Sequence, residues 1–93
     1  MIDFSKRVIV PAHVIVQDVE GESALLNQQS QRCFDLDEVG TAMWTALTVS
    51  ASIQEAYQDL LAQYDVAPDV LQHDLQQLVE QLLAAGLLEL ADG

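Results

Sequence analysis

The sequence of 93 residues has few features that stabilise a chain covalently or anchor it in a membrane. Its single cysteine, Cys33, has no second cysteine with which to form an internal disulfide. No apolar run approaches the roughly 20 residues that a membrane-spanning helix needs, and residues 1–10 lack the apolar stretch of a signal peptide. We therefore expect one domain with no membrane partner, located in the cytoplasm, whose hydrophobic share of 51% suffices for one core.

Basic residues are the scarcest class of charged residue. Lys6, Arg7 and Arg32 are the only cations against 15 carboxylates, which gives a formal net charge of −12. No Lys or Arg follows Arg32, whereas eleven of the carboxylates do. Because nucleic-acid binders gain most of their affinity by neutralising phosphates with Lys and Arg, we expect no nucleic-acid partner. The charge favours partners with basic or neutral surfaces, although a well-solvated surface explains it equally well.

Motifs for catalysis, metal binding and cofactor binding are also missing from the sequence. Cys33 has no basic residue near it in a helix that would activate a thiol. His13 and His73 lie far apart and outside any metal-binding motif, and the acidic residues 35–38 do not continue into a calcium loop. We predict a protein that is not an enzyme and that holds no metal or cofactor, with a hydrolase or redox protein using Cys33 as one alternative.

The hydrophobic pattern predicts a short segment followed by a small mixed domain. Residues 1–12 show no clear period, and we interpret them as an N-terminal arm that precedes a domain over residues 13–93. Short β-branched, apolar or alternating runs, separated by Gly21 and by a polar loop, predict three strands, over residues 13–19, 23–27 and 32–36.

Start and stop signals predict three helices after these strands. Asp37 is a candidate N-cap of the first helix, and Ser52 with Glu55 matches a capping box at the start of the second. Pro68 suits the first position of the third helix, and Gly86 is a typical stop signal after its leucine stripe. The expected fold is therefore α+β and winged-helix-like, with a three-stranded antiparallel sheet followed by three helices.

Two further features of the sequence lead to structural expectations: a glycine inside the first predicted helix, and a leucine-rich segment after the third. Gly40 inside the first helix costs about 1 kcal/mol relative to Ala, which a close backbone contact would explain. Residues 87–90 are expected to form a short strand or a tail that packs on the core.

The predicted arrangement offers a place for an extended peptide. If the third strand lies at a sheet edge, a peptide can pair with its free N–H and C=O groups, and the third helix then forms the opposite wall. Four backbone hydrogen bonds at about 1 kcal/mol each and two or three apolar side chains at about 1.5–3 kcal/mol each together supply about 7–13 kcal/mol, enough to reach the roughly 8 kcal/mol of micromolar binding. The sequence leaves open which flank of the helix faces the peptide: Val70, Asp74, Gln77 and Gln81, or Gln72, Gln76, Val79 and Leu83.

Several segments between Ser23 and Leu90 match a known pattern. They are Leu25-Leu26, the strand-to-helix block F-x-L-D-E-V-G-T-x-M-W from Phe34 to Trp44, Ile53 with Glu55, Leu61 with Tyr64-Asp65-Val66, and Val70 to Leu88. In these segments the chain resembles the PqqD family, the prototype of the peptide recognition elements in ribosomal peptide natural-product biosynthesis. The resemblance covers about three quarters of the chain, and the strand-to-helix block is its most specific part.

The resemblance implies a domain that binds the N-terminal leader of a precursor peptide. Such a domain presents the precursor to a maturation enzyme: a leader peptidase, a cyclase or a radical enzyme. As a stand-alone domain of this length, the chain is similar to the family members of lasso-peptide and quinone-cofactor pathways. The predicted peptide-binding residues are Arg32, Cys33, Phe34, Asp35, Val70, Asp74, Gln77, Leu78 and Gln81.

The same resemblance places Phe34 and Leu36 at core-packing positions, so we expect them to support the groove more than contact the peptide. The third helix carries no cation, and recognition of an acidic leader would depend on Arg32 or on backbone donors. An acidic interaction or regulatory module unconnected with peptide maturation is the alternative function. An unpaired strand edge would also permit a homodimer.

Overall fold

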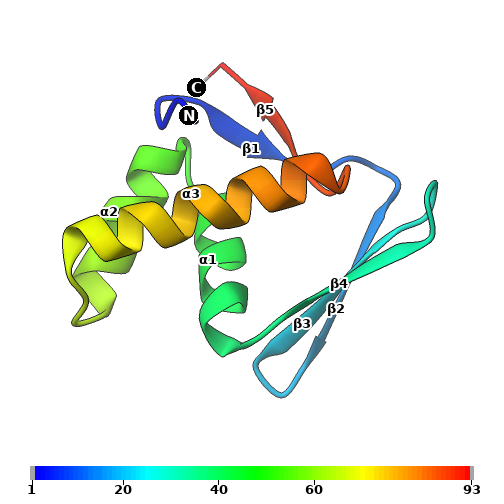
Figure 1. Ribbon diagram of the computed structural model, residues 1–93, viewed down its shortest axis with the longest axis horizontal. Helices are drawn as coiled ribbons and strands as arrows, with labels where there is room; N and C mark the ends of the chain where they lie inside the picture. Colours follow the sequence, from blue (N-terminus) through cyan, green and yellow to red (C-terminus); the bar gives the residue numbers. More distant parts are fainter. Residues whose placement is uncertain (1, 93) are drawn as a thin grey trace.

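The computed structural model of the chain describes residues 2–92, which form three helices and five strands (Figure 1). Three antiparallel strands precede three helices, so the predicted α+β fold is confirmed. None of the described helices is long and apolar enough to cross a membrane. In chain order the elements are β1 (Arg7–Ile9), β2 (Val14–Val19), β3 (Glu22–Asn27), β4 (Arg32–Leu36), α1 (Glu38–Val49), α2 (Ile53–Gln63), α3 (Pro68–Ala84) and β5 (Glu89–Ala91).

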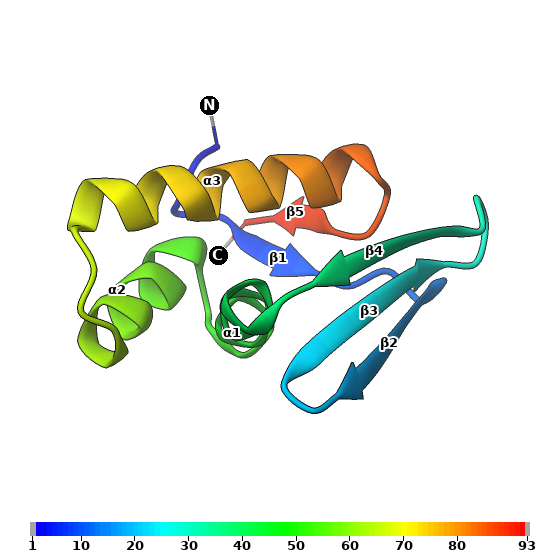
Figure 2. The same cartoon turned by 60° about the horizontal axis from the view of Figure 1, so that its bottom comes forward.

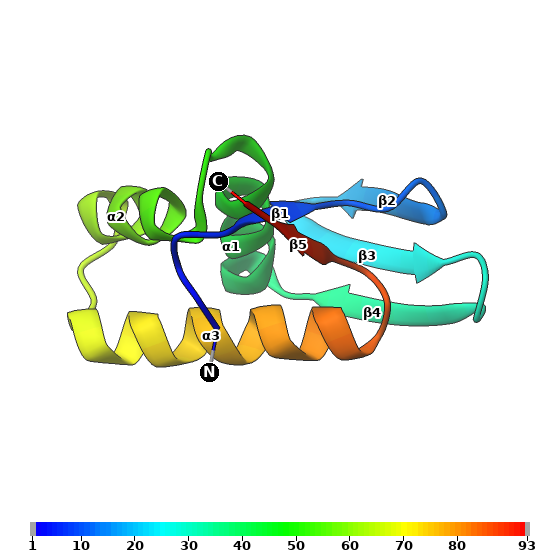
Figure 3. The ribbon, with the colours of Figure 1, turned by 90° about the horizontal axis from the view of Figure 1, so that it is seen from above.

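The larger sheet has the strand order β2-β3-β4, with both pairs antiparallel. Its first hairpin closes through Glu20 and Gly21, whose φ angles of 54° and 84° are the positive values that a type I′ turn requires. The side chains of Ser23, Leu25 and Asn27 are buried on one face. Figure 3 shows that β4 is the strand of this sheet on the side of α3.

A second, two-stranded sheet joins the ends of the chain. The segment expected as an N-terminal arm contains β1, which pairs antiparallel with β5 (Figure 2). Val8 of β1 is buried in the core. The Lys6 ammonium donates a hydrogen bond to the Asp92 carboxylate beside this pair, which raises the pKa of Lys6 and lowers that of Asp92. The segment after α3 was expected to form either a short strand or a tail that packs on the core. It does both, because Leu87 and Leu88 are buried and β5 follows them.

The helices begin where the capping signals predict. The Asp37 carboxylate accepts a hydrogen bond of 2.8 Å from the Gly40 N–H, and the Ser52 hydroxyl accepts one of 3.2 Å from the Glu55 N–H. The Glu55 carboxylate accepts from the N–H of Ala51 and not from that of Ser52, so the capping box is shifted by one residue on this side. α3 begins at Pro68. The core lies between the three helices, β1, β5 and the inner face of the larger sheet.

The C-terminal end of α3 is fastened to the larger sheet. Gly86 follows the helix at a φ of 72°, in the left-handed region that glycine adopts without strain, and thus ends the helix as predicted. The buried Asn27 amide donates to the Ala85 carbonyl at 3.0 Å, and His13 Nε2 donates to the Gly86 carbonyl at 3.1 Å. These bonds fix the position of α3 relative to β3 and hence to β4.

Candidate functional site

β4 is an edge strand of the larger sheet. It pairs with β3 on one side, and within residues 2–92 no strand pairs with its other side. The Gln28 N–H donates to the His13 carbonyl at 2.9 Å, which identifies this facing pair of residues as a hydrogen-bonded one. Because such pairs alternate along an antiparallel ladder, Leu26 and Ala24 of β3 bond to β2, and Leu25 of β3 bonds to β4.

The same alternation assigns the backbone groups of β4. Leu25 pairs with Phe34, so Phe34 and its alternate neighbour Leu36 direct their N–H and C=O groups to β3. Cys33 and Asp35 direct theirs to the free edge. The edge therefore offers two donors and two acceptors that no strand of the described chain uses.

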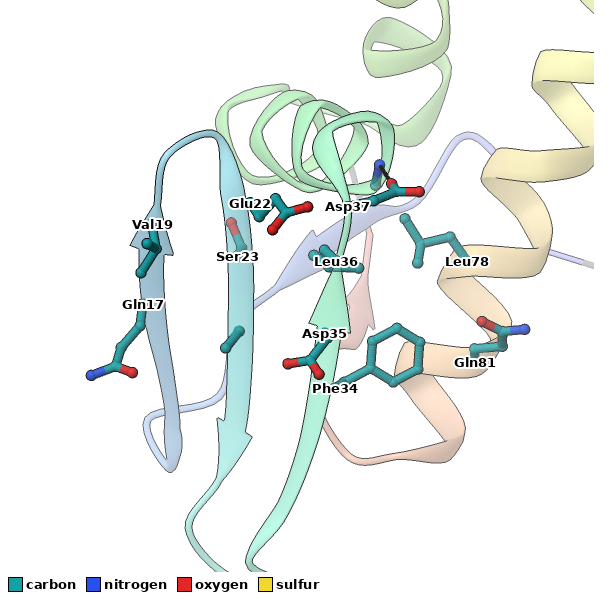
Figure 4. A pocket seen from close by; sticks show the side chains of 12 residues that line it. Gln17, Val19, Glu22, Ser23, Phe34, Asp35, Leu36, Asp37, Leu78 and Gln81 are labelled. Carbon is teal, nitrogen blue, oxygen red and sulfur yellow. Dashed lines mark hydrogen bonds between the residues drawn. The ribbon is translucent and has the colours of Figure 1, made fainter.

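A groove with a volume of about 690 Å³ lies between this edge and α3 (Figure 4). Phe34 and Asp35 line it from β4, and Leu78 and Gln81 line it from α3. Figure 4 shows the Phe34 ring pointing toward Leu78 and Gln81. Phe34 and Leu78 are both half-buried, so each packs on the core and still presents apolar surface to the groove.

The start of α1 closes one end of the groove. Asp37 and Gly40 line it there, and a Cβ atom on Gly40 would lie 3.2 Å from the Leu36 side chain and 3.3 Å from the Asp37 carboxylate. The sequence led us to expect a close backbone contact at this glycine, and the atoms that approach it belong to the side chains of Leu36 and Asp37. The groove also continues over residues that the sequence did not predict, which lie on β2 and β3: Gln17, Val19, Glu22, Ser23 and Ala24.

A second depression, of about 290 Å³, adjoins the opposite end of the groove. Phe34 and Gln81 line both, so the two form one surface along β4. Arg32 lines the second depression, whereas the residues of the first include the carboxylates of Asp35 and Asp37. The surface is therefore cationic at the hairpin end and anionic at the α1 end.

The structure brings together six of the nine predicted peptide-binding residues: Arg32, Cys33, Phe34, Asp35, Leu78 and Gln81 line this combined surface. Asp74 lines a different cavity, one helical turn away from Leu78. Val70 and Gln77 line neither the groove nor the second depression. Of the two flanks of α3 that the sequence left open, the one carrying Gln81 therefore faces β4.

The chemistry of the surface suits binding. Within residues 2–92 no three His, Cys, Asp or Glu side chains are grouped as metal ligands. Cys33 is an exposed free thiol on the sheet face opposite to the Phe34 ring, by the alternation of side chains along a strand. Edge backbone groups beside apolar side chains are the combination by which protein domains hold extended peptides.

Fold and surface together define a small winged-helix-like domain with a free sheet edge opposite a helix. The family model described as "Coenzyme PQQ synthesis protein D (PqqD)" matches residues 22–88, and the chain belongs to this PqqD family. A solved structure described as "TbiB1 in Complex with the TbiA(beta) Leader Peptide" has a TM-score of 0.79 and 28% sequence identity, over 86% of this chain and 93% of that one. No curated protein sequence matches at a significant level.

Proposed function

We propose that this domain binds the leader segment of a ribosomally made precursor peptide and presents it to a modifying enzyme or leader peptidase. The observation that carries the proposal is the edge of β4, whose two outward-facing residues lie beside a groove bounded by α3. Membership of the PqqD family supports it. So does the similarity to TbiB1, whose structure was solved in complex with a leader peptide.

The leader adds to the sheet as a strand beside β4. Cys33 and Asp35 each exchange an N–H and a C=O with it, so up to four backbone hydrogen bonds form, at about 1 kcal/mol each. Alternate side chains of the added strand point toward the core side of the sheet. There they contact the Phe34 ring and Leu78, which supply the apolar part of the binding energy.

The charges along the groove favour one arrangement of the leader. An acidic leader side chain is stabilised near Arg32, and neutral or basic side chains are stabilised near Asp35 and Asp37. Val70 and Gln77 lie outside the groove, so in this proposal they contact the leader only where it bends over the helix.

The role is to bind and present, in the cytoplasm, without catalysis. The partner enzyme is a leader peptidase, a cyclase or a radical enzyme, and a lasso-peptide pathway is one setting that fits a stand-alone domain. A second copy of the chain would compete for the same edge of β4. Binding is therefore measured at a protein concentration where sedimentation shows a monomer.

Amide hydrogen exchange tests the proposal at single residues. The probe is the leader of the precursor peptide encoded beside the gene, added to ¹⁵N-labelled protein. We expect the N–H groups of Cys33 and Asp35 to become protected when the leader binds, because no strand within residues 2–92 pairs with them in the free protein. Those of Phe34 and Leu36 are bonded to β3 and serve as internal controls, protected in both states. Leader binding without added protection at Cys33 and Asp35 would refute pairing at this edge, and absence of leader binding would refute the function.

A further inference from the structure

A separate apolar cavity of about 250 Å³ opens between α1 and the turn that joins α2 to α3. Its volume lies below the roughly 300–1,000 Å³ of sites that enclose a small-molecule ligand, so it fits a single side chain better. Val39 and Tyr64 line the cavity with side chains that are 61% and 49% exposed. The lining consists of Val39, Ala42, Met43, Leu60, Tyr64, Asp65, Val66, Leu71 and Asp74.

The cavity lies one helical turn along α3 from the groove beside β4. Gly40 and Leu78 line the groove, and Val39 and Asp74, which line the cavity, are the preceding residue in α1 and the residue one turn earlier in α3. One helical turn is about 5.4 Å long, which corresponds to about two residues of an extended peptide at 3.3 Å each. A peptide paired with β4 and running toward α1 therefore reaches the cavity about two residues after it passes Leu78.

The cavity also has a charge preference. Asp65 and Asp74 line it, and neither forms an ion pair within residues 2–92. The sequence has no Lys or Arg after Arg32, so α2, α3 and their connecting turn contain no cation. A bound segment with a Lys or Arg beside its apolar side chain complements these two carboxylates.

We propose that this cavity is a specificity subsite for the bound peptide, which inserts one apolar side chain there and places an adjacent Lys or Arg against Asp65 and Asp74. The inference rests on the proposed function, because the occupant is a continuation of the leader. It goes beyond strand pairing, because strand pairing contacts only the peptide backbone. The subsite instead favours a particular sequence: an apolar residue next to a basic one, just beyond the paired segment.

Matched substitutions test the subsite with the leader of the neighbouring precursor. Val39→Trp covers the cavity, and Val49→Trp is the control, because Val49 is an even more exposed valine of α1 that does not line the cavity. We expect Val39→Trp to weaken leader binding at least tenfold in fluorescence anisotropy and Val49→Trp to change it less than twofold. Asp74→Asn should weaken binding about threefold at low salt, whereas Asp59→Asn, with the same change in net charge, should not. Thermal unfolding verifies that each variant is folded.

A short probe tests the cavity without any leader. We expect N-acetyl-Leu-Arg-amide to shift the backbone amide resonances of Val39, Tyr64 and Asp74, and N-acetyl-Leu-Glu-amide to shift them less at the same concentration. Failure of the proposed function appears as a leader that does not bind the wild-type protein at all. Failure of the subsite appears as a leader that binds Val39→Trp and Asp74→Asn as well as it binds their controls, or as dipeptides that leave these resonances unmoved or shift them equally.

Discussion

The substitution Cys33→Pro separates binding at the β4 edge from folding. The register of the sheet directs the Cys33 N–H away from β3, so proline at this position removes no hydrogen bond of the chain's own ladder. Proline is tolerated on edge strands when its nitrogen faces solvent. The Cys33 side chain is exposed, so little packing is lost. We expect the free energy of unfolding to change by less than about 1 kcal/mol.

Leader binding should change far more than stability. Proline removes one donor to the leader and leaves a leader carbonyl without its partner, which costs about 1–3 kcal/mol, or roughly five- to 150-fold in affinity. The proline ring also occupies the space through which the added strand approaches. Isothermal titration calorimetry of the leader and urea denaturation of the free protein measure the two quantities on one preparation.

Val16→Pro is the matched control for this experiment. Val16 lies on β2, the other edge of the same sheet, and the alternation that frees the Cys33 N–H also directs the Val16 N–H outward. Leader affinity should be unchanged in Val16→Pro if the peptide pairs with β4. A folded Cys33→Pro protein that binds the leader with wild-type affinity would refute the reasoning, and weakening by Val16→Pro alone would move the binding site to β2.

Two further substitutions test the wall of the groove. Gly86→Ala should destabilise the protein by about 1–3 kcal/mol in urea denaturation. The reason is that the residue has a φ of 72° and that the new Cβ would lie 2.8 Å from the Asn27 amide nitrogen. Wild-type stability of the variant would show that this contact between the end of α3 and the larger sheet is not needed. Leu78→Ala should reduce leader affinity by about 1–2 kcal/mol through lost apolar contact. Gln77→Ala, one residue away and outside the groove, should leave the affinity within twofold in calorimetry. Equal effects of the two substitutions would contradict a groove on this flank of α3.

Local sequence signals predicted most of the elements because the elements depend on local chemistry. The alternation of Phe34 and Leu36 gave the bounds of β4, and the caps at Asp37, Ser52 and Gly86 gave helix ends that the structure confirms. The pairing of β1 with β5 was not predicted. It joins residues about 80 positions apart, and the short segment 7–9 carries too little pattern to indicate a partner.

The groove itself could be predicted only in part. Helix periodicity shows the leucine stripe of α3 but treats its two flanks alike, so it cannot tell which one faces β4. The Asn27–Ala85 hydrogen bond and the turn at Gly86 decide this by fastening the end of the helix to the sheet. The lining residues from β2 and β3, such as Val19 and Glu22, come to the groove through the sheet topology, which no local motif encodes.

A second copy of the chain could pair with the open edge of β4, and two features of the sequence oppose this. β4 has only five residues, and its charged Arg32 and Asp35 side chains interrupt the apolar surface that promotes edge-to-edge association. Two copies would also bring together net charges of −12 each, a repulsion that a neutral or basic peptide does not meet. If the edge binds a leader as proposed, the scarcity of cations disfavours a second copy of the chain as a competitor for an edge whose backbone alone would accept any extended chain.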